Sequence, residues 1–157
     1  MPGQIFAALG ERQAQALLSG DFAVYASVMA LPLRIIPRDD DAYVLHTEAE
    51  LHADFQLYHD SLKGRGVTDI FRQVVAFTVI DPSHLKVRCK THIMVQAQRI
   101  VDPFDTEFLL VAQSDGWLIA EVRNARGHSR FGLGLSEINR RASAPQLDDA
   151  GGDDGET

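Results

Sequence analysis

Cysteine is almost missing from the 157-residue sequence: Cys89 is the one thiol, so no disulfide can form within the chain. A chain without disulfides is typical of a reducing compartment, and we expect a cytoplasmic protein. Residues 1–6 lack the basic and apolar regions of a signal peptide. No apolar run approaches the roughly 18 residues that a membrane-spanning helix needs. We therefore expect a soluble protein with no membrane contact.

An excess of positive charge is missing as well, since the formal net charge is −7. Most of this charge lies in residues 143–157, which contain no Lys, Arg or aromatic residue but five acids: Asp148, Asp149, Asp153, Asp154 and Glu156. We interpret residues 143–157 as a disordered acidic tail and residues 1–142 as a single domain. The rest of the chain is nearly neutral and has no broad basic face that would attract nucleic acid.

Helical patterns occupy the N-terminal half. The spacing of apolar residues predicts a first helix over residues 4–18 and a short second helix capped by Asp21. Short strands are expected at residues 33–36 and 43–45. Thr47 and Glu50 have the spacing of a capping box, and they precede a stripe formed by Leu51, Phe55, Tyr58 and Leu62. This pattern predicts a third helix that ends near residues 64–66.

β-branched and aromatic residues dominate from residue 67 onward. Turn signals at residues 81–83, 102–103 and 114–116 divide the segment into four expected strands, near 67–80, 85–101, 104–113 and 117–125. Short turns join antiparallel neighbours, which predicts a meander. Two of these strands are longer than usual, so the sheet must coil or contain bulges. We expect an α+β fold in which three N-terminal helices pack on a strongly curved antiparallel sheet.

The alternation of side chains predicts what covers each face of this sheet. Residues 85–95 place one apolar set toward the helices and Lys90 and His92 on the opposite face. The last two strands are apolar on both faces, and the side expected to point away from the helices carries Leu109, Val111, Trp117 and Ile119. An exposed apolar patch usually marks an interface, so we favour a homodimer packed sheet to sheet. The alternative is that residues 127–142 fold back over this face.

Two segments, residues 16–22 (ALLSGDF) and 115–119 (DGWLI), give the chain a family resemblance over residues 4–125. It resembles the nuclear transport factor 2-like superfamily, which includes the SnoaL-like cyclases and ketosteroid isomerase. The resemblance implies a cone-shaped fold whose open end holds a small apolar ligand, and dimers formed through the convex face of the sheet. In ketosteroid isomerase the general base is an aspartate before a proline on the first strand. The matching place here is Ile36-Pro37, so the resemblance implies that this base is absent.

Few side chains suggest a binding or catalytic site. Tyr25 and Tyr58 lie on buried helical stripes, and Thr91 and Asn124 fall on the inward side of the sheet. These four residues are candidates for the polar groups of a ligand pocket. The alternative is that they are core residues whose polar ends find ordinary hydrogen-bond partners. Cys89 lies on the same inward side as Thr91, which predicts a buried and unreactive thiol.

The histidines predict neither a metal site nor a bound cofactor. His52 and His59 lie seven residues apart, too far for one ion, and we expect them on the surface. His92 has the chemistry of a general base, but a polar residue on the outer face is the favoured interpretation. Two functions stay open. One is a small-molecule-binding protein, and the family that the chain resembles includes isomerases, dehydratases and cyclases of this kind. The other is a noncatalytic dimerisation or protein-interaction module.

Overall fold

The computed structural model describes residues 2–37, 41–114 and 116–125 of the chain. The predicted acidic tail at 143–157 and the segment 127–142 lie outside the described residues. Three helices precede most of the sheet, as predicted: α1 (Pro2–Ser19), α2 (Phe22–Val28) and α3 (Glu48–Gly64). Within the described part of the chain, no helix is long and apolar enough to cross a membrane.

The helix boundaries follow from local chemistry. Gly20, with φ of +79°, provides the left-handed turn that ends α1. The carboxylate of Asp21 accepts a hydrogen bond from the Val24 N–H at 3.2 Å and caps α2. Thr47 and Glu50 form the predicted reciprocal capping box at the start of α3. These three signals confirm the predicted starts of α2 and α3 and the end of α1, whereas α1 begins at Pro2, two residues before the predicted start.

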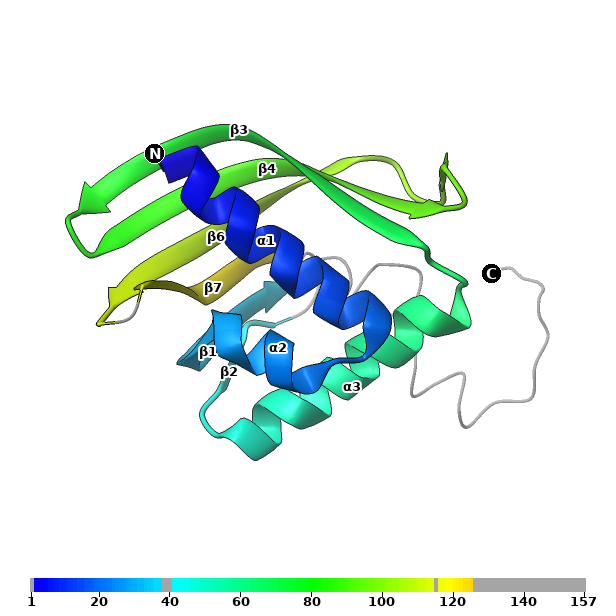
Figure 1. The fold of residues 1–157 in the computed structure, drawn as a ribbon, viewed down its shortest axis with the longest axis horizontal. Coiled ribbons are helices and arrows are strands. Elements are labelled where there is room, and N and C mark those ends of the chain that lie inside the picture. The colour runs from blue at the N-terminus through cyan, green and yellow to red at the C-terminus, as the bar shows by residue number, and fades with distance from the viewer. Residues whose placement is uncertain (1, 38–40, 115, 126–157) are drawn as a thin grey trace.

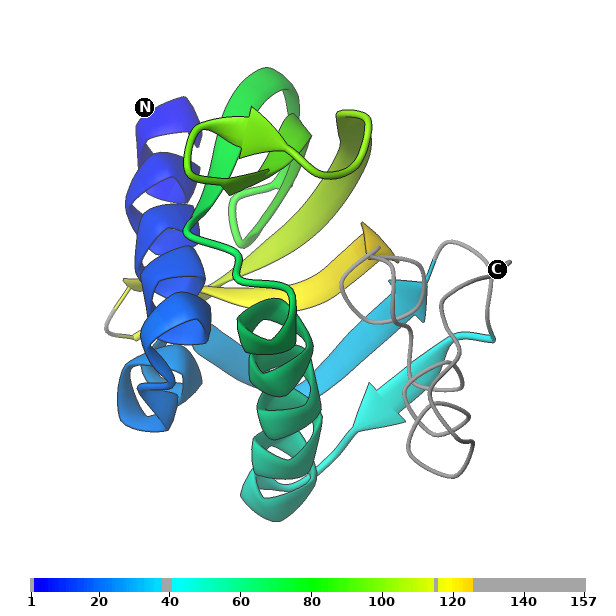
Figure 2. The same cartoon turned by 90° about the vertical axis from the view of Figure 1, so that its right-hand side faces the viewer.

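Seven strands form one mixed sheet: β1 (Met29–Pro37), β2 (Tyr43–Leu45), β3 (Asp69–Asp81), β4 (His84–Val95), β5 (Gln98–Arg99), β6 (Phe104–Gln113) and β7 (Gly116–Ala125). Their order is β2-β1-β7-β6-β4-β3, and β5 pairs with β4. The predicted antiparallel meander is the β3-β4-β6-β7 part of the sheet, whereas β1 runs parallel to β7. Figures 1 and 2 show the three helices on one side of this sheet. The strong curvature and the cone shape stay predictions.

The segment predicted as one strand over 85–101 is divided in the structure. β4 ends at Val95, and the chain reverses through Gln96 and Ala97, which have φ of 49° and 70°. β5 then pairs back on Met94 and Val95. A two-residue turn with two positive φ values joins antiparallel strands tightly. The sequence prediction missed it because neither residue is glycine, asparagine or aspartate.

The core lies between the helices and one face of the sheet. Phe6, Leu17, Phe55 and Leu62 of the helices are buried against inward residues of β1, β4, β6 and β7. The inward set predicted for β4 is confirmed, since five of its residues are buried: Leu85, Val87, Cys89, Thr91 and Ile93.

Two residues expected on the outer face, Trp117 and Ile119, point the other way. Ile119 is fully buried in the core, and Trp117 packs against it. In the ladder, Ile119 lies opposite Leu110 and Trp117 opposite Ala112, while Glu121 lies opposite Leu109. The extra residue of β7 between Ile119 and Glu121 is a bulge, so the alternation changes there and both Ile119 and Val122 point inward. The predicted face of Trp117 and Ile119 was therefore wrong.

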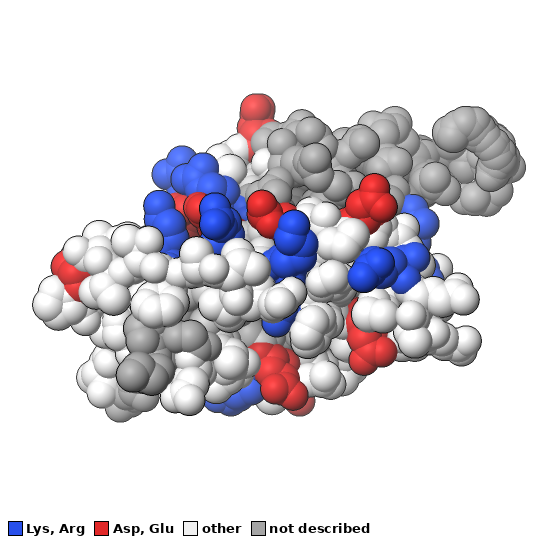
Figure 3. All heavy atoms as spheres, turned by 90° about the horizontal axis from the view of Figure 1, so that it is seen from above, with Lys and Arg blue, Asp and Glu red and all other residues white. Residues whose placement is uncertain are grey.

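The outer face is mainly charged. Ion pairs join Lys90 to Asp105 at 3.5 Å, Arg123 to Glu107 at 3.8 Å, and Arg123 to Glu121 at 3.5 Å. Leu109 lies opposite Glu121, Val111 lies between His84 and Leu118, and both side chains are half-buried. Figure 3 shows positive and negative side chains interspersed in a band, with uncharged surface beside it. The face that was expected to be apolar is therefore covered largely by paired charges.

Candidate functional site

Polar side chains gather inside the protein where the three helices meet the sheet. The buried members are Gln13 of α1, Tyr25 of α2, and Asp54 and Tyr58 of α3. Their burial follows from helix geometry, since position 54 lies three residues after Leu51 and four before Tyr58. Asp54 therefore faces the core along with the apolar stripe of α3. Few carboxylates are buried in proteins unless they are paired, so this position is informative.

Asp54 is held by a tyrosine from the short strand β2. The hydroxyl of Tyr43 donates a hydrogen bond to Oδ1 of Asp54 at 2.8 Å. Burial raises the pKa of Tyr43 far above its ordinary value, and the charge of Asp54 and this hydrogen bond raise it further. Tyr43 therefore stays protonated and donates a hydrogen bond to Asp54, which fixes the orientation of the Asp54 carboxylate.

Tyr25 presents a hydroxyl that has no hydrogen-bond partner among the residues that the structure describes. Its ring is fully buried and packs on Phe55, with 4.8 Å between ring centroids. Burial raises the pKa of Tyr25 well above its ordinary value, and the Asp54 carboxylate and the neighbouring Tyr58 hydroxyl add to the effect. The charge of Arg72 and the side chain of Gln13, which lies close to the hydroxyl without making a hydrogen bond of ordinary geometry, lower the pKa. The group stays a neutral phenol, able to donate one hydrogen bond.

Tyr58 completes a set of three tyrosines around Asp54. Burial raises the pKa of its hydroxyl, Arg72 opposes this, and the charge of Asp54 raises it again. Each of the three phenols is therefore kept in its protonated form. The helices and β2 thus bring one carboxylate and three neutral phenols together at the edge of an apolar core.

Arg72 of β3 brings a positive charge to the edge of this cluster. Its guanidinium donates to Oε1 of Gln13 at 2.7 Å and to the carbonyl of Gly10 at 3.3 Å. It also lies over the ring of Phe108, 5.1 Å from the centroid. These contacts hold Arg72 beneath α1 and fix Gln13 in the interior. Arg72 also lines a groove of about 380 Å³ between α1 and β3.

Thr91 and Asn124, the other two predicted pocket residues, do not join this cluster in the described part of the structure. Thr91 is buried on the inward face, and its hydroxyl lies 3.0 Å from that of Thr106. This contact favours an ordinary core pair. Asn124 belongs to β7, but its side chain lies outside the described part of the structure. Cys89 is buried beside this pair, and burial raises the pKa of its thiol.

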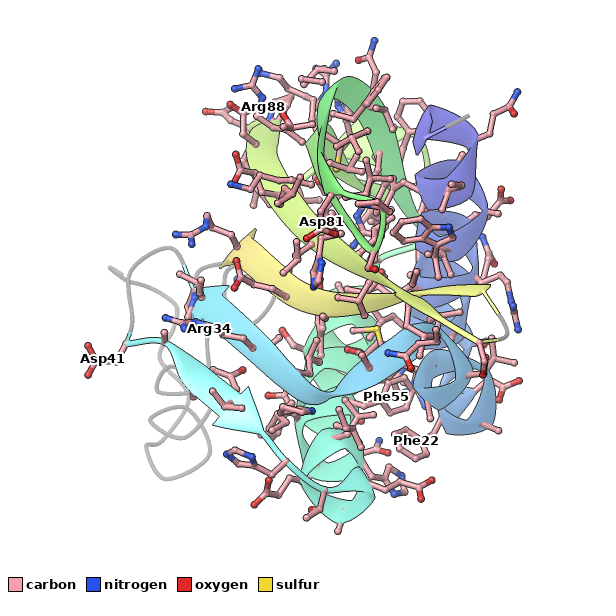
Figure 4. All side chains as sticks on the ribbon, turned by 90° about the vertical axis from the view of Figure 1, so that its left-hand side faces the viewer. Phe22, Arg34, Asp41, Phe55, Asp81 and Arg88 are labelled. Atoms are coloured by element: carbon pink, nitrogen blue, oxygen red, sulfur yellow. The ribbon has the colours of Figure 1, made fainter. Side chains whose placement is uncertain are left out.

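The histidines have structural contacts. His59 is half-buried, with Nδ1 2.6 Å from the carbonyl oxygen of Leu17 and its ring stacked on Phe55. His52 stacks on Phe22 with 4.2 Å between centroids. Figure 4 shows Phe22 of α2 and Phe55 of α3 side by side at this helix junction. The expected surface position is therefore confirmed for His52, which is exposed, and wrong for His59, which is half-buried at the helix junction.

His92 lies far from the interior cluster in the topology, on the outer face of β4 opposite Phe71. Its Nδ1 accepts a hydrogen bond from Arg99 at 3.2 Å. Partial burial lowers the pKa of His92, and the charges of Arg99 and Lys90 lower it further. In the part of the chain that the structure describes, no three His, Cys, Asp or Glu residues are grouped in a way that could hold a metal ion.

Sequence reasoning found Tyr25 and Tyr58 but missed Gln13, Tyr43, Asp54 and Arg72. The available signal was a polar residue on an apolar helical stripe, which occurs at Gln13 and at Asp54. Such residues are expensive to bury, and a buried polar residue is more informative than an exposed one. Tyr43 and Arg72 gave no such signal, since strand positions next to a helix are known only from the packed fold.

Comparison with known proteins places the fold. No protein-family model matches the chain, and no curated protein matches it. A solved nuclear transport factor 2-like protein of unknown function from Shewanella oneidensis is 15% identical with a TM-score of 0.59, covering 78% of this chain and 98% of that one. A structure named a "putative ketosteroid isomerase" from Shewanella frigidimarina is 20% identical with a TM-score of 0.56, covering 74% and 90%.

A third similar structure is named a "putative dehydratase from the NTF2-like family" of Streptomyces avermitilis. It is 11% identical with a TM-score of 0.57, covering 76% of this chain and 91% of that one. Sequence identities of 11–20% support a shared fold but do not establish a shared activity. The chain therefore has the nuclear transport factor 2-like fold, which its sequence resembles.

Proposed function

We propose that the protein binds a small molecule with an apolar body and one carbonyl or hydroxyl oxygen, at the interior cluster of Tyr25, Asp54 and Tyr58. The observation that carries this proposal is the Tyr25 hydroxyl, which is buried without a partner among the described residues. Leaving such a group unsatisfied costs about 1–3 kcal/mol. A ligand oxygen that accepts from this hydroxyl would remove the cost.

The same cluster has the groups that proton-transfer chemistry needs. Asp54, oriented by Tyr43, can accept a proton from a carbon or oxygen of the ligand, while Tyr25 donates to a developing negative charge on the ligand oxygen. Isomerases and dehydratases both use such a pair. The names of two similar structures support this class for the present chain. Asp54 would supply from α3 the carboxylate that is absent at Ile36-Pro37 of β1.

Binding is testable with a panel of small aromatic ketones and phenols. We expect at least one compound to raise the unfolding temperature of the wild-type protein. The Kd of that compound should become about tenfold weaker for Tyr25→Phe, because the variant loses one hydrogen bond to the ligand. Thr91→Val is the control, since Thr91 faces Thr106 and should leave the affinity unchanged. The proposal fails if no compound stabilises the wild type or if Tyr25→Phe binds equally well.

The second candidate function is a noncatalytic interaction module. A specific observation favours it: large apolar side chains of β3 are exposed, including Phe71 and Phe77. This surface is separate from the interior cluster, so binding of a small molecule and association with a partner are compatible.

A further inference from the structure

The strand β3 exposes more large apolar side chains than any other described element. Five of the seven large hydrophobic residues that are exposed lie on it: Phe71 (57%), Val75 (46%), Phe77 (51%), Val79 (61%) and Ile80 (52%). The strand is 13 residues long and lies at one end of the sheet. Natural proteins usually shorten such an edge, place charges on it or cover it. None of residues 73–80 is charged, so this edge lacks that protection.

These side chains emerge on both faces of the sheet. Phe71 lies opposite His92 on the outer face, whereas Phe77 and Val79 lie opposite the buried Val87 and Leu85 on the helix side. The bulge at Val75 causes this change of side. Figure 1 shows the β3–β4 hairpin reaching past the N-terminal end of α1, so α1 leaves this part of the helix side uncovered.

A groove continues the exposed surface along the open edge. It has a volume of about 380 Å³ and lies between α1 and β3, with Phe6, Ala7, Ile70 and Phe71 among its lining residues. A strand added beside β3 would direct its helix-side residues into this groove, because neighbouring strands share the same two faces. The groove therefore offers space for apolar side chains from another strand.

We propose that β3 pairs antiparallel with β3 of a second copy of this chain, which joins the two sheets into one across a two-fold axis. A two-fold axis places each segment against itself, so charged residues near its centre would repel their copies. The uncharged run 73–80 meets this requirement. A second copy also offers a free edge of equal length. Strand addition to an exposed edge is an established mode of association, and it satisfies the backbone groups of both edges.

One pairing register of the two β3 strands places helix-side residues of one copy opposite helix-side residues of the other. If Val74 lies opposite the partner's Phe77, Arg72 lies opposite the partner's Val79, and all four are helix-side residues. Phe77 and Val79 of each copy then reach the groove of the other. The five exposed side chains leave on the order of 500 Å² uncovered in each copy. With the backbone edge and the groove added, the buried area approaches the roughly 800 Å² per partner of a standard interface.

This arrangement differs from the sheet-to-sheet dimer predicted from the sequence, in which Leu109 and Val111 form the contact. Light scattering and sedimentation on the full-length chain distinguish the two. We expect a dimer that Val79→Lys weakens roughly a hundredfold or more, because the ammonium would be buried directly opposite the guanidinium of the partner's Arg72. Ile80→Lys is a second variant at an exposed position, and Leu109→Lys is the matched control on the outer face.

Circular dichroism and thermal unfolding verify that each variant is folded, which is expected because these side chains are exposed in one copy. The proposal is supported if Val79→Lys and Ile80→Lys are folded monomers while Leu109→Lys stays a dimer. It is overturned if the wild type is monomeric, if both folded β3 variants stay dimeric, or if only Leu109→Lys dissociates.

Discussion

At the scale of single residues, the interior holds two tyrosines with opposite roles in stability. Tyr43 donates to Asp54 at 2.8 Å, whereas the Tyr25 hydroxyl has no partner among the described residues. A hydroxyl that stabilises a carboxylate is worth about 1.5–3 kcal/mol, but a buried hydroxyl without a partner is a cost. The same substitution should therefore have different effects at the two positions.

We expect Tyr43→Phe to lower the free energy of unfolding by about 2 kcal/mol, because Asp54 loses a donor inside the core. Tyr25→Phe should leave the stability unchanged or raise it by up to about 1 kcal/mol, since it removes an unsatisfied group. Urea unfolding of the ligand-free protein measures both values. A large loss for Tyr25→Phe would show that its hydroxyl has a partner in the folded chain.

The predictability of the site also depends on individual residues. Tyr25 and Tyr58 were predicted because they lie on apolar stripes in which an aromatic residue is expected. Asp54 lies on the same stripe as Tyr58, but a stripe traced through apolar residues alone passes over it. The pairing of Asp54 with Tyr43 depends on β2 lying beside α3. Contacts of this kind follow from tertiary packing and leave no trace in local periodicity.

At the scale of secondary-structure elements, local signals predicted the helices well and the strands less well. The capping box at Thr47 and the Asp21 cap placed α3 and α2, because a cap depends on only a few neighbouring residues. Strand ends and side-chain direction depend on the partner strand. The bulge in β7 placed Ile119 in the core, although simple alternation predicted the outer face. A single extra residue is enough to reverse this prediction.

The turn between β4 and β5 gives a testable case at this scale. Gln96 and Ala97 both adopt positive φ, which residues with a Cβ adopt only at a cost. We expect Ala97→Gly to raise the free energy of unfolding by roughly 1 kcal/mol, because glycine has no such penalty. Ala112→Gly in β6 is the control and should lower it by roughly 0.5–1 kcal/mol, as glycine does inside a strand. Chemical denaturation measures both, and a loss of stability for Ala97→Gly would contradict the turn geometry.

At the scale of the whole molecule, the two faces of the sheet and its β3 edge differ in their side chains and in what covers them. The inner face packs against the helices and holds the polar cluster, the outer face carries paired charges, and β3 exposes apolar side chains at the edge. The overall fold was predictable because the α+β pattern and the family resemblance depend on element order. The location of the apolar surface was not, because it depends on how far α1 covers β3.

A substitution at Trp117 tests whether this residue belongs to the core of one copy or to an interface between two copies. It is the one tryptophan of the chain and packs against the core opposite Ala112. We expect Trp117→Lys to lower the free energy of unfolding by about 3 kcal/mol or more, because a charge replaces a large apolar contact within one copy. The change in unfolding temperature should be the same at low and high protein concentration. Val79→Lys should instead abolish the concentration dependence and change the low-concentration value little, since Val79 is 61% exposed in one copy and is covered by the second copy in the proposed dimer. If Trp117→Lys unfolds like the wild type but is monomeric, the tryptophan belongs to the interface and the β7 bulge does not direct it inward.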